Sequence, residues 1–512
     1  MNARLIVVVM AGSLFSAGRA ASQVVINVSS GTTVPVQAKF SGFNAPQIRN
    51  GVEYYDPKFM AVVTPLKPGW VRYPGGTGSM AFDWVSAHMN TAWMAELASV
   101  VPASTTSLLT TAQQLTQAKG GVSFSDFTTF AQTLGANAIV CFNGFTDTTP
   151  GSISVMAHQA QQSGLNVIEW ELNNEPYQFP LIYPSSSSYA AAMYNPYFTE
   201  LVGEAPSATA GVFFQGAFSG SSGNAYKTWD SGLSSYTPQY WNAASIHIYP
   251  LTNTTLTPQQ KVQTLNGILA YGSAQYISTY VIPKTGPNTS IFVTELNCCL
   301  AAGDTFLTVQ YNGIFLAEYT ARLSRVPNVK AVGVHSLYSN IYDYHGAVRS
   351  IQDFQTYLVS QVLHDPNYST NTATDPNTQY QFYTTAPGLA MQIANSVIND
   401  SAASWTTSVT GGPTVPILGY DGKPVRAVYA QAYQGLSNNH YVLITNKAST
   451  AQSVNIQVDN ASVTAPLQLT YISNPSATAS NTALAPNTIQ IQTAIAANPI
   501  TVGPYSVTAV SW

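Results

Sequence analysis

Charged side chains are scarce in this chain of 512 residues. Only 8% of the residues are charged, 18 Lys and Arg stand against 22 Asp and Glu, and the formal net charge is -4. The basic residues form no cluster along the sequence. Binding to nucleic acid or to a sulfated polyanion requires several neighbouring Lys and Arg side chains. We therefore expect neither of them to be a partner.

Cysteine is equally rare, with Cys141, Cys298 and Cys299 the three copies. An odd number excludes complete intramolecular disulfide pairing. No His and Cys spacing is typical of a zinc site, so we expect no metal and no organic cofactor.

Long apolar runs are also missing, apart from the N-terminal stretch. Residues 1–20 combine a short basic start, an apolar run and small residues at a cleavage point, which predicts a signal peptide and a secreted or periplasmic protein. A membrane anchor is the alternative, but the apolar run is short for a bilayer. Because no later stretch is typical of a membrane span, we expect no membrane partner.

Eight short apolar runs recur over residues 38–400, separated by helical or loop segments. Each is typical of a buried parallel strand. Eight strand-then-helix units predict an α/β fold, a (β/α)8 TIM barrel. A doubly wound sheet is the alternative, but it leaves the strand count unexplained. The runs are 38–44, 70–76, 138–144, 167–175, 211–217, 244–250, 291–297 and 331–338.

The sequence changes character near residue 400. Short alternating runs with turn residues fill 401–512 and predict a C-terminal antiparallel β-sandwich domain. Residues 21–37 alternate in the same way and have no place in the barrel. We expect them to add an N-terminal strand to the sandwich.

Polar residues stand where the eight runs end. The carboxyl ends of barrel strands meet at one mouth, where barrel enzymes bind their substrates. The candidates for this mouth are Asn44, Arg72, Gly75, Gly76, Asn174, Glu175, His247, Tyr249, Glu295 and Tyr338.

Three glutamates in "IEWELNNEPYQF" (168–179) share one strand face if the strand stays regular. Glu175 precedes a proline that ends the run, which places it at the rim. Glu171 points into the barrel, where a carboxylate needs a partner, and Arg72 is the candidate. Glu169 lies deeper and receives no role.

Glu175 and Glu295 end the fourth and seventh runs, so they can face each other across the mouth. Two carboxyl groups ~5 Å apart suit retaining glycoside hydrolysis, with one as proton donor and the other as nucleophile. Two ordinary rim carboxylates are the alternative reading of the spacing.

Four motifs carry a family resemblance over nearly the whole mature chain. "WELNNEP" (170–176), "HIY" (247–249) and "VTEL" (293–296) resemble the motifs of clan A glycoside hydrolases. Together with "VRYPGG" (71–76), they are similar to glycoside hydrolase family 79, which holds β-glucuronidases and heparanases. The resemblance implies a retaining exo-β-glycosidase that acts on β-linked glycosides or oligosaccharides.

The resemblance also implies residue roles. Glu175 corresponds to the acid/base and Glu295 to the nucleophile. Asn174 corresponds to the ligand of the sugar 2-hydroxyl, and Tyr249 to the tyrosine that bonds the nucleophile. Arg72 is expected to bond the nucleophile in competition with its Glu171 pairing. Contacts to the sugar are expected from Asn44, His247, Gly75 and Gly76.

One loop departs from the family pattern. The glucuronidases hold the substrate carboxylate in a Tyr-Gly-rich loop after the nucleophile, but residues 297–306 read "NCCLAAGDTF". Tyr338 is the remaining donor candidate, with Tyr311 and Tyr342 as further possibilities. A neutral β-glucoside, β-galactoside or β-xyloside is therefore an alternative substrate, and a barrel that binds carbohydrate without catalysis is a third reading.

Overall fold

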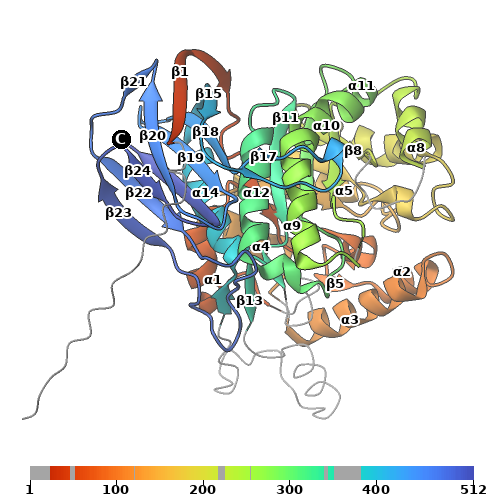
Figure 1. Cartoon of the computed structure of the whole chain (residues 1–512). Helices are drawn as coiled ribbons and strands as arrows, with labels where there is room; N and C mark the ends of the chain where they lie inside the picture. Colours follow the sequence, from red (N-terminus) through yellow and green to blue (C-terminus); the bar gives the residue numbers. More distant parts are fainter. Residues whose placement is uncertain are drawn as a thin grey trace, which may run out of the picture.

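The structure is a computed structural model of the whole chain (Figure 1). It describes residues 23–46, 52–119, 121–216, 225–253, 255–339, 344–350 and 382–512. The predicted signal peptide, residues 1–20, lies outside the described residues.

Eight parallel strands form a closed barrel in chain order, so the TIM barrel prediction is confirmed. Each strand overlaps one of the eight apolar runs, because a strand covered on both faces needs apolar side chains throughout. The strands are β2 (Ser41–Asn44), β3 (Trp70–Tyr73), β6 (Asn137–Phe142), β7 (Val167–Leu172), β8 (Ala210–Phe213), β9 (Ala243–Ile248), β10 (Ser290–Leu296) and β11 (Val329–His335).

Helices surround the barrel, and local sequence signals fix their ends (Figure 1). Helix α4 (Phe124–Thr133) begins with a capping box. Ser123 Oγ accepts from the Asp126 amide at 3.0 Å, and Asp126 Oδ2 accepts from the Ser123 amide at 3.0 Å. Helices α5 (Ser152–Ser163) and α9 (Pro258–Gly267) follow the third and sixth strands. Within the described ranges, no helix is both long enough and apolar enough to cross a membrane.

Ten other strands form the sheet of the second domain. It runs in the order β21-β20-β1-β15-β18-β19-β25-β22-β23, with β24 beside β20. The bounds not given elsewhere are β18 (Val428–Gly435), β19 (His440–Asn446), β21 (Ala461–Ser462), β23 (Gln492–Ala496), β24 (Ile500–Val502) and β25 (Ser506–Ser511). One apolar cluster contains Val454 of β20 (Gln452–Val458) and Leu467 of β22 (Leu467–Ile472), which lie toward opposite ends of this order. The sheet therefore folds over on itself, and the β-sandwich prediction is confirmed. A smaller separate sheet joins β12 (Tyr338–Ser339), β13 (Val348–Ser350) and β14 (Phe382–Thr384).

The N-terminal strand joins this sandwich as expected. Strand β1 (Val24–Pro35) pairs antiparallel with β15 (Ser401–Thr410), with Val25 opposite Thr410. On its other side it pairs with β20 in parallel, with Ile26 opposite Ile456. The sandwich is therefore not wholly antiparallel, because one inserted strand runs the same way as one of its two neighbours.

A buried ion pair fastens the two domains together. Glu318 lies on α12 (Gln310–Leu323) and accepts hydrogen bonds from Lys447 Nζ (2.7 Å) and Thr445 Oγ1 (2.6 Å) of the sandwich. Arg322, one turn along the helix, contacts the other carboxylate oxygen at 2.7 Å. Burial would raise the pKa of Glu318, but Lys447 and Arg322 outweigh it and lower the pKa to about 2.

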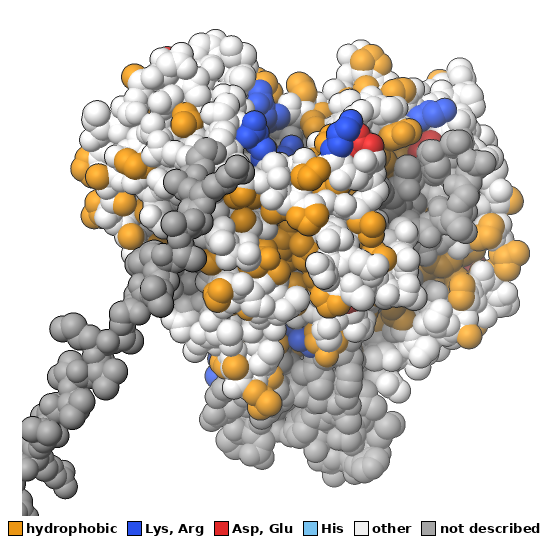
Figure 2. All heavy atoms as spheres, in the orientation of Figure 1, with side chains coloured by type: hydrophobic (Ala, Val, Ile, Leu, Met, Phe, Trp, Pro, Cys, Tyr) orange, Lys and Arg blue, Asp and Glu red, His pale blue; other side chains and the backbone are white. Residues whose placement is uncertain are grey.

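The described surface carries few charges. On the face drawn in Figure 2, most side chains are uncharged, and Lys and Arg occur at a few points, most of them in its upper part. This agrees with the composition of the chain, in which 8% of the residues are charged.

Candidate active site

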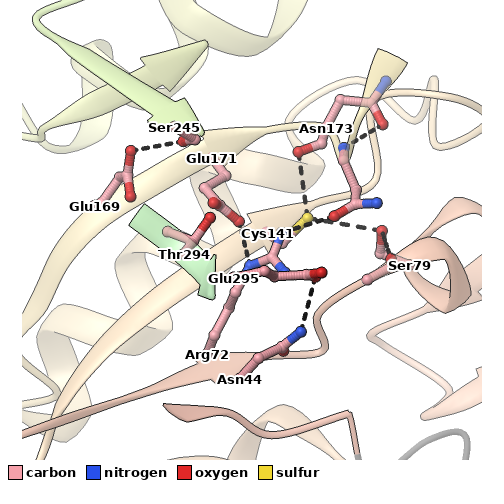
Figure 3. Close-up of polar contacts among 12 residues, drawn as sticks. Asn44, Arg72, Ser79, Cys141, Glu169, Glu171, Asn173, Ser245, Thr294 and Glu295 are labelled. Carbon is pink, nitrogen blue, oxygen red and sulfur yellow. Dashed lines mark hydrogen bonds and ion pairs between the residues drawn. The ribbon is translucent and has the colours of Figure 1, made fainter. Parts of the chain in front are cut away.

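Glu295 lies next to the carboxyl end of β10 and is held by donors from three other strands (Figure 3). Its Oε1 accepts from Arg72 Nη1 at 2.7 Å and from Asn44 Nδ2 at 2.9 Å. Its Oε2 accepts from the Tyr249 hydroxyl at 2.6 Å. Asn44 and Arg72 end or nearly end the first and second strands, and Tyr249 directly follows the sixth. The carboxylate is therefore fixed in one orientation.

Arg72 is fully buried and binds three side chains at once. Its Nε donates to Glu171 Oε2 at 2.5 Å, and its Nη2 donates to Asn174 Oδ1 at 2.8 Å. The expected competition between Glu171 and Glu295 does not arise, because the planar guanidinium presents separate N–H groups to each carboxylate. Glu171 is the buried partner that the sequence predicted.

The chain bends sharply before Glu175. Strand β7 ends at Leu172, and Asn173 and Glu175 adopt positive φ angles of 91° and 44°. The prediction of one regular strand up to Glu175 is therefore wrong. The buried Asn173 side chain stabilises the bend, since its Oδ1 accepts from the Asn174 amide at 2.8 Å. The bend still leaves Glu175 at the mouth.

Three side chains hold the Glu175 carboxylate. His247 Nδ1 lies 2.8 Å from Oε1, and the Tyr177 hydroxyl donates to the same oxygen at 2.8 Å. Gln178 Nε2 donates to Oε2 at 2.5 Å. Tyr177 and Gln178 belong to the short turn that Pro176 begins.

His247 bridges the two glutamates. Its Nδ1 is 2.8 Å from Glu175 Oε1 and 3.5 Å from Glu295 Oε2. Because both contacts start at the same nitrogen, the two carboxylate oxygens are no farther apart than the sum of these distances. That sum is below the ~6.5 Å at which inverting geometries begin. This upper bound favours the retaining geometry over the inverting one.

The surrounding charges favour an ionised Glu295. Burial alone would raise its pKa, but the imidazoles of His247 and His335, followed by Arg72, hold the pKa well below its usual value. Burial opposes the charge on His247, yet the carboxylates of Glu295 and Glu175 raise its pKa above the usual value. Burial and Glu295 raise the pKa of Tyr249, which keeps this hydroxyl a donor.

The predicted glycine pair lies beside Asn44. Gly75 and Gly76 have φ angles of 74° and 66°, which glycine adopts without strain. A Cβ atom on Gly75 would lie 2.1 Å from Asn44 Oδ1. Gly75 therefore allows Asn44 the position from which it reaches Glu295.

Tyr338 does not join this group. Strand β11 ends at His335, and Tyr338 belongs to the next strand, β12 (Tyr338–Ser339). Its ring is fully buried, with centroids 5.7 Å from both Phe59 and Phe382. The ring packs against these two phenylalanines, and the contact of Tyr338 with a substrate carboxylate stays a prediction.

The two further tyrosines do not replace it. The hydroxyl of Tyr311 donates to Asn266 Oδ1 on α9, in the packing between helices. Tyr342 lies outside the described residues.

Two histidines of the site were missed by the sequence reading. His335 Nδ1 lies 3.0 Å from Asn44 Nδ2 and 3.6 Å from Glu295 Oε2. The ring of His345 lies 5.0 Å from that of His335 and 6.3 Å from that of Tyr249. His335 ends the eighth strand and could have been found there, whereas no spacing signal marks His345.

Glu169 lies on β7 and is fully buried; it stands at the left in Figure 3. Its Oε1 accepts from Ser245 Oγ at 2.8 Å. Burial and the nearby Glu171 raise the pKa of Glu169 well above its usual value. Both effects favour the protonated form of this side chain.

In the described part of the chain, no group of three or more His, Cys, Asp or Glu side chains is arranged to hold a metal ion. The site consists of carboxylates, imidazoles, amides, tyrosine hydroxyls and one guanidinium.

Comparison with known proteins gives structural matches alone. No protein-family model and no curated protein matches the chain. The GH51 arabinofuranosidase from Xanthomonas axonopodis pv. citri is 13% identical, with a TM-score of 0.66 over 96% of this chain and 99% of that one. The α-L-arabinofuranosidase from Thermotoga maritima is 15% identical, with a TM-score of 0.66 over 96% and 100%.

A third match is a 4-O-α-L-rhamnosyl-β-D-glucuronidase from Fusarium oxysporum 12S. It is 14% identical, with a TM-score of 0.57 over 95% of this chain and 100% of that one. These similarities show that the chain shares the fold of these three glycosidases, a TIM barrel with a C-terminal sandwich.

Proposed function

We propose that this protein is a retaining exo-β-glycosidase in which Glu295 is the nucleophile and Glu175 the acid/base. The observation that carries the proposal is the bridge of His247 between two carboxylates at 2.8 Å and 3.5 Å. A barrel that only binds carbohydrate would not need one of these carboxylates fixed by Arg72, Asn44 and Tyr249.

The reaction follows a double displacement. Glu175 donates a proton to the glycosidic oxygen while Glu295 attacks the anomeric carbon, which releases the leaving group and forms a covalent glycosyl-enzyme. Glu175 then removes a proton from water, and this water attacks the same carbon and frees Glu295. Asn174, which Arg72 holds at 2.8 Å, is assigned to the sugar 2-hydroxyl.

The first candidate substrate is a β-glucuronide. The motifs "VRYPGG" (71–76) and "WELNNEP" (170–176) support this assignment through their similarity to family 79. The imidazoles of His335 and His345 beside Tyr249 add polar groups that suit an acidic sugar.

A neutral sugar is the second candidate. Two observations favour it: the loop at 297–306 has no tyrosine, and the ring of Tyr338 is buried against Phe59 and Phe382. The resemblance of the fold to arabinofuranosidases adds an arabinofuranoside to the β-glucoside, β-galactoside and β-xyloside already considered.

We also propose that the protein is secreted. The basic start and apolar run within residues 1–20 support a cleaved signal peptide.

A panel of nitrophenyl glycosides tests the activity and the sugar together. The panel holds the β-glucuronide, the three neutral β-glycosides and the α-L-arabinofuranoside, each assayed with the unsubstituted enzyme and with Glu295→Ala. We expect the β-glucuronide to have the highest kcat/KM and Glu295→Ala to abolish its turnover. Faster turnover of a neutral glycoside would replace the first candidate by the second, and equal turnover by Glu295→Ala would refute the mechanism.

A further inference from the structure

His247 contacts both glutamates of the candidate active site, yet the mechanism proposed above gives it no step. Its side chain has no exposed area, and the ring of Phe213 lies 5.2 Å from the imidazole. Nδ1 lies 2.8 Å from Glu175 Oε1 and 3.5 Å from Glu295 Oε2. Of these two carboxylates, Glu175 is the nearer and the more exposed, with 12% of its side chain accessible against 7%. A proton that leaves the imidazole for the mouth therefore passes through Glu175.

The other contacts of Glu175 favour its carboxylate form. Oε1 accepts from the Tyr177 hydroxyl at 2.8 Å, and Oε2 accepts from Gln178 Nε2 at 2.5 Å. Burial and the Glu175 charge raise the pKa of Tyr177 well above its usual value, so this hydroxyl remains a donor. Hydrogen bonds donated to a carboxylate favour its charged form. The acid step, however, needs a proton on Glu175, and this proton requires a nearby source.

His247 has the surroundings of an imidazolium. Burial opposes its charge, and so does the guanidinium of Arg72 on β3, but the carboxylates of Glu295 and Glu175 outweigh both and raise the pKa of His247. The two nitrogens of an imidazolium are both donors, and each of them faces an oxygen atom here.

The second of these oxygens belongs to Thr294, the residue before Glu295 on β10 (Figure 3). Its Oγ1 lies 3.2 Å from His247 Nε2, and the side chain is fully buried. A hydroxyl group both donates and accepts. Thr294 therefore accepts from the imidazolium and donates back to the neutral imidazole, so both charge states of His247 are satisfied.

We propose that His247 stores the proton that Glu175 delivers to the glycosidic oxygen, and takes a proton back when water attacks the glycosyl-enzyme. The proposal rests on the proposed glycosidase function and adds a positioning residue to it, since His247 acts through Glu175. The observations that carry it are the 2.8 Å contact between Nδ1 and Oε1, the burial of the imidazole and the donors on Glu175.

The proton balance closes over the two displacements. In the first, the proton moves from Nδ1 to Glu175 and then to the glycosidic oxygen, whose bond to the anomeric carbon breaks. The attack of Glu295 consumes one of the two negative charges that favour the imidazolium, so the proton is released as the nucleophile reacts. In the second, water gives a proton to Glu175 and its oxygen to the anomeric carbon. Glu295 leaves as a carboxylate and favours the return of the proton to His247.

The pH dependence of kcat/KM tests the proposal, with the nitrophenyl glycoside that the unsubstituted enzyme hydrolyses fastest. His247→Asn places an amide donor near the position of Nδ1 but holds no titrating proton. His158→Asn is the matched control, because His158 Nδ1 lies 2.7 Å from Glu204 Oε1 in a similar pair on the exposed side of α5.

We expect the basic limb of the unsubstituted enzyme to lie above about pH 6.5, the ordinary imidazole value, because both carboxylates hold the proton on the pair. In His247→Asn the limb should move down by about one pH unit or more, which lowers kcat/KM about tenfold on the basic side. Dinitrophenyl glycosides, whose leaving group needs little protonation, should change by less than about threefold. His158→Asn should keep the limb of the unsubstituted enzyme.

A second measurement needs no turnover. In protein labelled with ¹³C at histidine Cε1, the nuclear magnetic resonance signal that His247→Asn removes belongs to His247. This signal should titrate above about pH 6.5, and Glu175→Gln should lower the midpoint by removing a carboxylate. Thr294→Val removes the acceptor of Nε2–H, so it should lower both this midpoint and the kinetic limb.

Three results would overturn the proposal. They are an unshifted basic limb in His247→Asn, equal losses for nitrophenyl and dinitrophenyl glycosides, and a His247 signal that stays neutral down to about pH 5. If His247→Asn does not fold, the Thr294→Val limb and the Glu175→Gln midpoint decide in its place. Failure of the unsubstituted enzyme to hydrolyse any glycoside contradicts the proposed function itself, whereas turnover with an unshifted limb contradicts the proton store alone.

Discussion

Arg72→Met separates the structural and catalytic parts of the buried charge cluster. Arg72 is fully buried and serves Glu171 through Nε (2.5 Å) and Glu295 through Nη1 (2.7 Å). Methionine keeps much of the side-chain volume but leaves both carboxylates without this cation. Stability and activity should therefore both fall, for different reasons.

The magnitudes follow from these contacts. Breaking a buried ion pair costs about 3–5 kcal/mol, because the remaining Glu171 carboxylate is uncompensated. A hydrogen bond to a charged group contributes about 1.5–3 kcal/mol, so loss of the Glu295 contact should lower kcat/KM by about 10- to 150-fold.

Glu171→Gln, alone and combined with Arg72→Met, completes the experiment. In the double variant the uncompensated Glu171 charge is gone, so we expect most of the lost stability in urea unfolding to return. The activity loss should remain, because Glu295 still lacks its Nη1 donor. Full recovery of kcat/KM in the double variant would refute the reasoning, as would an Arg72→Met protein that is as stable as the parent.

Three further predictions follow from other parts of the molecule. Glu175→Ala should slow the hydrolysis of nitrophenyl glycosides by about 10²- to 10⁴-fold and that of dinitrophenyl glycosides much less. When azide is added to this variant, chromatography should detect a β-glycosyl azide. Absence of this product would count against the acid/base role. Glu169→Gln should gain stability relative to the parent as pH rises above the unfolded glutamate value of about 4.5. Because the pKa of Glu169 is raised in the folded state, the unfolded state loses this proton first as pH rises. The free energy of unfolding of the parent then falls by up to about 1.4 kcal/mol per pH unit. A difference in Tm between the two proteins that does not depend on pH would contradict this. Glu318→Gln should cost about 3 kcal/mol at pH 7, since it leaves Lys447 buried without its carboxylate. The stabilisation by Glu318 is present above its unfolded pKa near 4.5 and is lost as pH falls toward its folded pKa of about 2. The difference in unfolding free energy between Glu318→Gln and the parent should therefore be smaller at pH 3 than at pH 7.

The barrel could be predicted from sequence because its strands are buried on both faces. Runs such as "AIVCFNG" (138–144) and "IFVTELN" (291–297) are apolar until the strand ends, and a polar residue then marks the mouth. The same signal predicts that Asn44, Arg72, His247 and Glu295 meet at the mouth, and the first three do contact Glu295.

Other features depend on contacts that a linear pattern does not encode. The bend at Asn173 and Glu175 requires positive φ angles. A glycine at these positions would have indicated such angles, but the sequence has none there. Tyr338 faces Phe59 and Phe382 because the eighth strand stops at His335, three residues before the predicted end. A shift of this kind decides which face of the chain a side chain occupies.

The site residue with the least sequence signal is His345. It reaches Tyr249 through the small sheet that follows the barrel, and its Nε2 contacts Cys299 O at 3.1 Å. Such long-range placement follows from how β13 and β14 pair beyond the mouth, and not from residue spacing.

Trapping of the glycosyl-enzyme tests the central claim most directly. A 2-deoxy-2-fluoro-β-glucuronyl fluoride slows the second displacement more than the first, so the covalent intermediate should accumulate and be visible in the intact mass. We predict one sugar per chain, attached to Glu295 in the peptide that contains "IFVTELN" (291–297). The matching neutral fluorosugars extend the test to the second candidate substrate. Attachment to another residue, or hydrolysis of an aryl glycoside with inversion at the anomeric carbon, would contradict the account.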